Sequence, residues 1–161
     1  MGNRRKSREL ALQALFYIDA SKENAITALR HFCDTFTPPR VARPFFMKLV
    51  GGVVCAQADI DNLLIRFSSH WKLGRMSCVD RNILRIAVFE LFCCQDIPAK
   101  VSINEAIDIG KKYGTEDSGA FINGILDSIR LAMETEGLQI EIGPLPEEFI
   151  EIQVQGEDNG E

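Results

Sequence analysis

The sequence predicts an all-α protein. Apolar residues recur at the i, i+3, i+4 spacing of a helix over almost all of residues 3–134, and no convincing strand alternation comes before residue 137. The chain has 161 residues, 46% of them hydrophobic, so one domain or two small lobes can enclose a core. It contains no run of 18 apolar residues, and the basic start leads into a charged helical pattern. Neither a membrane span nor a secretory signal is therefore predicted.

The first half of the chain predicts three helices. One carries an apolar stripe over residues 10–18 and follows a basic cluster, and a weaker one covers residues 25–36 before the Thr-Pro-Pro sequence at 37–39. A long helix follows Pro44 and reaches residue 67. Its Gly51-Gly52 pair costs about 1 kcal/mol per glycine relative to alanine. We expect the close approach of a neighbouring helix to compensate for this cost.

The second half predicts further helices. Residues 70–78 are expected to form a connector with one glycine, and Asp80 is expected to open the next helix. The S-x-x-E spacing that begins at Ser102 is typical of a capping box at a helix start. Gly114 is expected to end that helix in the left-handed conformation, and a last helix carries the apolar positions of residues 121–129.

Charge is divided unevenly along the chain. Residues 134–161 hold nine acidic and no basic residues, so the rest carries 18 basic against 14 acidic residues, although the whole chain has a formal net charge of -5. The body is mildly basic, and the low net charge does not argue against nucleic acid. Residues 1–134 are expected to form the domain, with subdomains of about 1–69 and 70–134. A hairpin is conceivable in the tail at 135–161, but an extended or disordered tail is favoured.

The sequence offers little for catalysis or metal binding. The five cysteines include no C-x-x-C pair, and neither His31 nor His70 has a second ligand at metal spacing. The adjacent Cys93 and Cys94 are more typical of a reduced cytosolic protein than of a redox site. Neither a nucleophile beside a base nor a phosphate-binding loop is found. We therefore expect no enzyme, no metal and no cofactor.

Two features favour RNA instead. Four bases crowd into residues 4–8 at a helix start, where the helix dipole disfavours cations and a phosphate backbone would compensate. Residues 111–121 combine bases, aromatic rings, carboxylates and a helix N-terminus, a mixture that suits single-stranded RNA. Each has a plainer interpretation, as a solvated basic end and as an ordinary turn between helices.

Several blocks of residues occur in a characteristic order and spacing. They are residues 4–15 (RRKxRExAxQAL), 84–91 (LRIAVFEL), 97–107 (IPxxVxINEAI), 111–114 (KxYG) and 121–127 (FINGILD). Together they resemble the NusB family of bacterial transcription antitermination factors. The resemblance covers about residues 3–131.

This resemblance implies a fold of two packed three-helix bundles, here followed by an acidic C-terminal extension. It implies a cytoplasmic protein that binds the boxA element of ribosomal RNA leader transcripts together with NusE, the tenth protein of the small ribosomal subunit. That complex joins NusA and NusG on RNA polymerase and suppresses premature termination, and it catalyses no chemistry.

Site residues follow from the matching positions. The resemblance implies RNA contacts at Arg4, Arg5, Lys6, Arg8, Lys112, Glu116, Asp117 and Phe121. It implies a surface that faces NusE at Phe16, Asp80 and Arg85. Phe16 stands where the family often has tyrosine, so this chain lacks the hydroxyl that could make a contact there. Gly119 and Ala120 leave the turn without a base just before Phe121.

Other interpretations stay open. One is the related RNA-binding module of ribosomal RNA cytosine methyltransferases, which would make the chain a helper in rRNA maturation or methylation. Another is a helical scaffold that binds only protein. Some family members are thought to form homodimers, which the sequence does not decide. We also hypothesise that the acidic tail folds back on the basic helix as an RNA mimic; the alternative is a solvated tail with no role.

Overall fold

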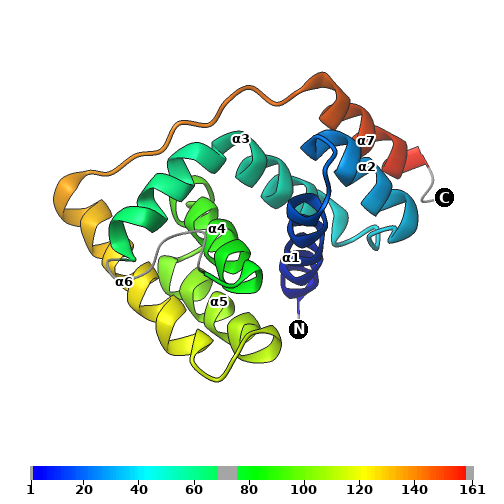
Figure 1. The fold of residues 1–161 in the computed structure, drawn as a ribbon. Helices are drawn as coiled ribbons and strands as arrows, with labels where there is room; N and C mark the ends of the chain where they lie inside the picture. Colours follow the sequence, from blue (N-terminus) through cyan, green and yellow to red (C-terminus); the bar gives the residue numbers. More distant parts are fainter. Residues whose placement is uncertain (1, 69–75, 159–161) are drawn as a thin grey trace. The chain divides into compact units, whose positions relative to one another are not determined.

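The computed structural model describes residues 2–68 and 76–158 of the chain, and within them it contains helices and no strand. The helices are α1 (Asn3–Ala20), α2 (Ala25–Thr35), α3 (Arg43–Phe67), α4 (Cys78–Cys93), α5 (Ala99–Tyr113), α6 (Ser118–Glu136) and α7 (Glu147–Asp158) (Figure 1). The all-α prediction is confirmed. Most of the predicted connector at 70–78, including His70, lies outside the described residues. None of the described helices is long and apolar enough to cross a membrane.

The chain divides into two compact units, and the division falls inside α3. The first unit joins residues 1–55 to residues 143–161, whereas the second comprises residues 56–142. The sequence predicts a boundary between subdomains near residue 69. The long helix α3 has no breaker at residue 55, so nothing in the local pattern marks this division.

The first unit holds α1, α2, the first half of α3 and α7. The Asn24 side chain caps α2 by accepting a hydrogen bond of 2.9 Å from the Thr27 amide. Rings from α2 and α3 form the centre of the unit, where Phe32 and Phe46 stack with centroids 6.1 Å apart and are both buried. The apolar stripe of α1 packs into the same core through Ala11, Leu15 and their neighbours.

The second unit is built around α4. Every residue from Asn82 to Leu91 is buried, so the helix is enclosed on all sides. The Ser77 hydroxyl accepts a hydrogen bond of 3.0 Å from the Asp80 amide, and α4 therefore begins at Cys78, two residues before the predicted start at Asp80. Helices α5 and α6 pack against α4 and against each other.

The predicted capping box at Ser102 is wrong. Helix α5 already begins at Ala99, directly after Pro98, and Ser102 lies buried inside it. Its hydroxyl donates a hydrogen bond of 3.0 Å to the carboxylate of Glu90 on α4, which is also buried. The Ser102 hydroxyl therefore supplies a hydrogen bond to the buried Glu90 carboxylate on another helix and does not cap the amides at the start of its own helix.

The acidic tail differs from the sequence expectation. Residues 137–146 have no helix or strand, but residues 147–158 form α7 where an extended or disordered segment was favoured. Phe149 and Ile152, three residues apart on α7, are both buried; α7 packs against α2, and the Phe149 ring lies beside Gly51 of α3. The sequence expectation gave more weight to the many acidic residues of the tail than to Phe149 and Ile152, the two apolar residues that anchor this helix.

Gly51 makes this packing of α7 fit. A Cβ atom at Gly51 would lie 2.6 Å from Cζ of Phe149, so only a glycine admits the ring at this distance. The predicted close approach of a helix at the Gly51-Gly52 pair is confirmed, and α7 is that helix. The amide of Gly143 donates to the Cys55 carbonyl at 3.0 Å, and Arg30 lies 3.6 Å from Glu151. These contacts hold the tail on α2 and α3.

Candidate nucleic-acid interface

The basic cluster forms the first turns of α1, in the first unit. Arg4 and Lys6 are exposed, and Arg5 is half-buried. Arg8 is only 4% exposed, whereas a side chain that contacts phosphate is expected to be exposed. The side chains predicted to form one basic surface therefore divide into exposed and buried groups.

Two contacts tie this start of α1 to the start of α3. The Ser7 hydroxyl lies 2.6 Å from the carbonyl oxygen of Ala42 and 2.8 Å from that of Asn3, so its single proton is shared between two acceptors. The guanidinium carbons of Arg4 and Arg8 each lie 5.3 Å from the centroid of the Phe45 ring. Both distances are within the roughly 6 Å range of a cation–π interaction.

The turn between α5 and α6 belongs to the second unit. Helix α5 ends at Tyr113, as predicted, but Gly114 has a φ of -94° and not the left-handed conformation. Its role is steric, because a Cβ atom there would collide with the side chain of Ser118. The Thr115 amide donates to the Ser118 hydroxyl at 2.9 Å and closes the turn.

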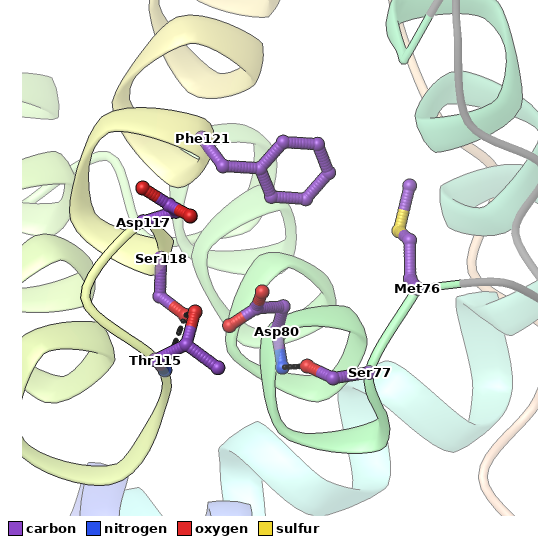
Figure 2. Close-up of a pocket in the computed structure, with 7 residues that line it drawn as sticks. All are labelled: Met76, Ser77, Asp80, Thr115, Asp117, Ser118 and Phe121. Carbon is purple, nitrogen blue, oxygen red and sulfur yellow. Dashed lines mark hydrogen bonds between the residues drawn. The ribbon is translucent and has the colours of Figure 1, made fainter.

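A hollow of about 200 Å³ opens beside this turn (Figure 2). Its lining comes from the α5–α6 turn, the start of α6 and the start of α4: Met76, Ser77, Asp80, Thr115, Asp117, Ser118 and Phe121. The Phe121 ring extends over the hollow towards Met76, and the Asp80 carboxylate lies between Ser77 and the turn. The volume is below the roughly 300–1,000 Å³ of pockets that enclose a small-molecule ligand.

Carboxylates and an aromatic face meet in this hollow. Asp117 is exposed at the N-cap position of α6 without a side-chain cap hydrogen bond, and Phe121 is half-buried. One oxygen of Asp80, Oδ1, is buried without a hydrogen-bond partner. An exposed carboxylate such as that of Asp117 can accept hydrogen bonds from a base edge while the ring stacks on the face of the base. Among the described residues, no group of three or more His, Cys, Asp or Glu side chains could hold a metal ion.

Two more predicted RNA contacts lie near this hollow along the chain. Lys112 and Glu116 are both exposed, and the Lys112 amine lies 5.1 Å from the centroid of the Tyr113 ring. Neither lines the hollow. The structure thus gives them open positions on the turn, and their contacts with RNA stay predictions.

The residues predicted to face a protein partner belong to different units and differ in exposure. Phe16 is on α1 in the first unit and is 49% exposed, as an aromatic anchor requires. Asp80 shares the hollow with Asp117 and Phe121. Arg85 is buried, and its guanidinium donates two hydrogen bonds of 2.8 Å to Asp61 and one of 3.0 Å to Asn82. The geometry gives Arg85 an internal role, and its partner contact stays a prediction.

Sequence reasoning missed three contributors. Phe45 supports the arginines, and Met76 and Ser77 line the hollow. The S-x-x-D spacing that begins at Ser77 could have revealed the cap of α4. No local signal marks Phe45 or Met76, because an apolar residue near a helix start is ordinarily interpreted as part of the hydrophobic core.

The comparison with protein families gives a clear result. The model of the NusB family matches residues 5–130 of this chain. The transcription antitermination protein NusB of Desulfatibacillum aliphaticivorans is 54% identical over 136 residues, which cover 84% of this chain and 95% of the relative. The corresponding NusB of Syntrophus aciditrophicus is 45% identical over 147 residues, 91% of each chain.

Solved structures agree with these relatives. T. maritima NusB superposes with a TM-score of 0.71 at 36% identity and covers 92% of this chain and 96% of its own. A complex described as antitermination factors NusB and NusE with double-stranded RNA contains a chain with a TM-score of 0.71 at 27% identity, covering 81% of this chain and 97% of its own. The sequence blocks, the helical fold and these similarities lead to one conclusion: this chain belongs to the NusB family.

Proposed function

We propose that this chain is a transcription antitermination protein that binds boxA-type RNA of ribosomal RNA leader transcripts together with NusE. It acts without catalysis, in the cytoplasm, where the transcript is made, and it joins NusA, NusG and RNA polymerase indirectly. The family membership supports this function, and the related NusB–NusE complex contains RNA. The observation that carries the proposal is the convergence of Asp80, Asp117 and Phe121 on one open hollow.

The two candidate regions supply different parts of recognition. The exposed bases of α1 neutralise phosphates whatever the sequence, whereas the carboxylates and ring of the hollow distinguish bases. A hollow of about 200 Å³ that opens to solvent suits one flat base better than an enclosed substrate. Affinity and selectivity should therefore respond to different substitutions.

Fluorescence anisotropy tests this function. A boxA RNA and a scrambled RNA are titrated with the chain at several salt concentrations, with and without NusE. Selective binding that NusE tightens is the expected result, with a log–log salt slope of about -3 if about four phosphates of a single strand are neutralised. Weak, unselective binding that ignores NusE would instead favour a general module of rRNA maturation. Binding to NusE without salt-dependent RNA binding would indicate a protein scaffold.

Two variants separate the predicted roles. Asp117→Asn should lower the ratio of boxA to scrambled affinity by about tenfold, because a good base contact contributes about 1–3 kcal/mol of discrimination. Its control is Glu134→Gln, an exposed carboxylate elsewhere on α6. Arg5→Ala should weaken binding of both RNAs equally, with Arg40→Ala, an exposed arginine outside α1, as its control. An equal loss for both RNAs in Asp117→Asn would contradict a role in readout.

A further inference from the structure

The first turn of α1 lacks the usual stabilisers of a helix start. Its N-cap is Gly2, which makes no side-chain cap hydrogen bond, and no acidic residue lies in the first turn. The four cations at residues 4–8 face the positive end of the helix dipole. Such a turn is expected to fray unless tertiary contacts hold it. A frayed turn would scatter the charges on which phosphate binding depends.

The Phe45 ring supplies such a contact to two of the four cations. Arg4 and Arg8 are four residues apart and therefore lie on one face of α1. Each guanidinium carbon is 5.3 Å from the centroid of the same ring. The hydrogen bond of 2.6 Å from Ser7 to the Ala42 carbonyl fixes the same turn against the residues just before α3. One side of the basic turn is thus held by the start of α3.

We propose that Phe45 is a positioning residue for RNA binding, whose ring holds Arg4 and Arg8 so that the start of α1 presents an ordered set of charges to phosphates. This inference rests on the proposed function. Arg4 is exposed and can donate to a phosphate, whereas Arg8 is buried and serves mainly as an anchor. Arg5 and Lys6 project from other sides of the helix and depend on the same turn being formed.

The burial of the ring argues against a purely structural role. The next residue, Phe46, is fully buried and stacks with Phe32 in the core. Phe45 is only half-buried. The core of the first unit therefore depends on Phe46, and a change at Phe45 can alter the arginines while the core stays packed.

Substitution of the ring tests the proposal in the full chain. Phe45→Leu keeps an apolar side chain but removes the aromatic face, and it should weaken binding of boxA RNA by about tenfold at low salt. The salt slope should become shallower by about 0.7 for each phosphate of a single strand that is no longer neutralised. Phe45→Tyr keeps the face and should restore both values. Phe67→Leu is the matched control, because that ring lies 4.8 Å from the guanidinium of Arg66, in the second unit.

A double-mutant cycle separates positioning from general damage. If Phe45 acts through the arginines, Phe45→Leu should cause little further loss of affinity in the Arg4→Ala/Arg8→Ala background. Additive losses would overturn the proposal, as would unchanged affinity and slope in Phe45→Leu. A loss of the helical circular dichroism signal in Phe45→Leu that Phe45→Tyr fails to restore would also overturn it, since the ring would then serve the fold.

A measurement without RNA keeps this inference separate from the proposed function. The Phe45 ring current should shift the side-chain proton resonances of Arg8 upfield in the free protein, and the shift should disappear in Phe45→Leu and persist in Phe45→Tyr. Absence of that shift in the wild-type chain would refute the positioning itself. A wild-type chain that shows the shift but binds neither RNA would instead refute the proposed function.

Discussion

Replacing Gly51 by alanine tests whether α7 is held by the close approach to α3. A Cβ atom at this position would lie 2.6 Å from Cζ and 2.7 Å from Cε1 of Phe149, and 3.2 Å from Cδ1 of Leu145. Real Cβ contacts are essentially never shorter than 3.0 Å. The Phe149 ring is 2% exposed, so it can yield only by leaving its site, together with the start of α7.

Two opposing contributions set the size of the effect. Alanine in a helix interior is favoured over glycine by about 1 kcal/mol. Exposure of a buried phenylalanine costs about 1.5–3 kcal/mol. We therefore expect Gly51→Ala to lower the free energy of unfolding by about 0.5–2 kcal/mol. In the Phe149→Ala background the clash is gone, and the same substitution should raise the free energy of unfolding by about 1 kcal/mol.

The four proteins to compare are the wild type, Gly51→Ala, Phe149→Ala and the double variant. Urea denaturation followed by circular dichroism measures their free energies of unfolding and shows whether the effect of Gly51→Ala changes sign between the two backgrounds. Hydrogen exchange of residues 147–152 reports separately on whether α7 stays docked. Gly124→Ala is the control, because Gly124 lies inside α6 and a Cβ atom there would meet nothing within 4 Å. A stabilisation by Gly51→Ala of equal size in both backgrounds, with unchanged exchange in α7, would refute the reasoning.

Three further outcomes are expected. Arg85→Ala should lower the free energy of unfolding, measured by urea denaturation, by about 3 kcal/mol, because it leaves the Asp61 carboxylate without its buried partner. A change within experimental error would contradict the internal role of Arg85. Ser102→Ala should cost about 1–2 kcal/mol, since the buried Glu90 carboxylate loses a donor, and Ser128→Ala on the exposed face of α6 should cost much less in the same assay. Burial raises the pKa of the Cys33 thiol to about 11. Alkylation of Cys33, mapped by mass spectrometry, should therefore be slow at pH 8 and should become about tenfold faster per pH unit up to that pKa. Labelling as fast as that of an exposed thiol would contradict the burial of Cys33.

Most helices could be predicted from the sequence because two strong signals agree in them: the helical spacing of apolar residues and the breakers that end a helix. The stripe of α1 and the Thr-Pro-Pro sequence after α2 are local, and no distant residue is needed to interpret them. The start of α5 was misplaced because Ser102 matched a local motif while its actual partner, Glu90, lies on another helix. Helix α7 was missed for a related reason, since a short helix depends for its stability on tertiary packing, here against α2 and beside Gly51 of α3, more than on its own residues.

The candidate site was predictable in part. Asp117 and Phe121 are close neighbours along the turn, so their grouping follows from sequence alone. That Asp80 opens into the same hollow depends on how α4 packs against α5 and α6. The support of Arg4 and Arg8 by Phe45 likewise joins two helices. Contacts between elements carry no local pattern, so the sequence alone does not group Asp80 with Asp117 and Phe121; the predicted contact of Asp80 with a protein partner stays a prediction.

The complete enclosure of α4 has a consequence for how this region tolerates change. An ordinary amphipathic helix accepts substitutions on its outer face, so a mutational scan shows an intolerant position every three or four residues. From Asn82 to Leu91 the scan should show an unbroken block of intolerance, with the polar residues Asn82, Arg85 and Glu90 as sensitive as their apolar neighbours. The amides of this block should also be the last in the second unit to exchange, which makes α4 the part whose opening coincides with unfolding of that unit.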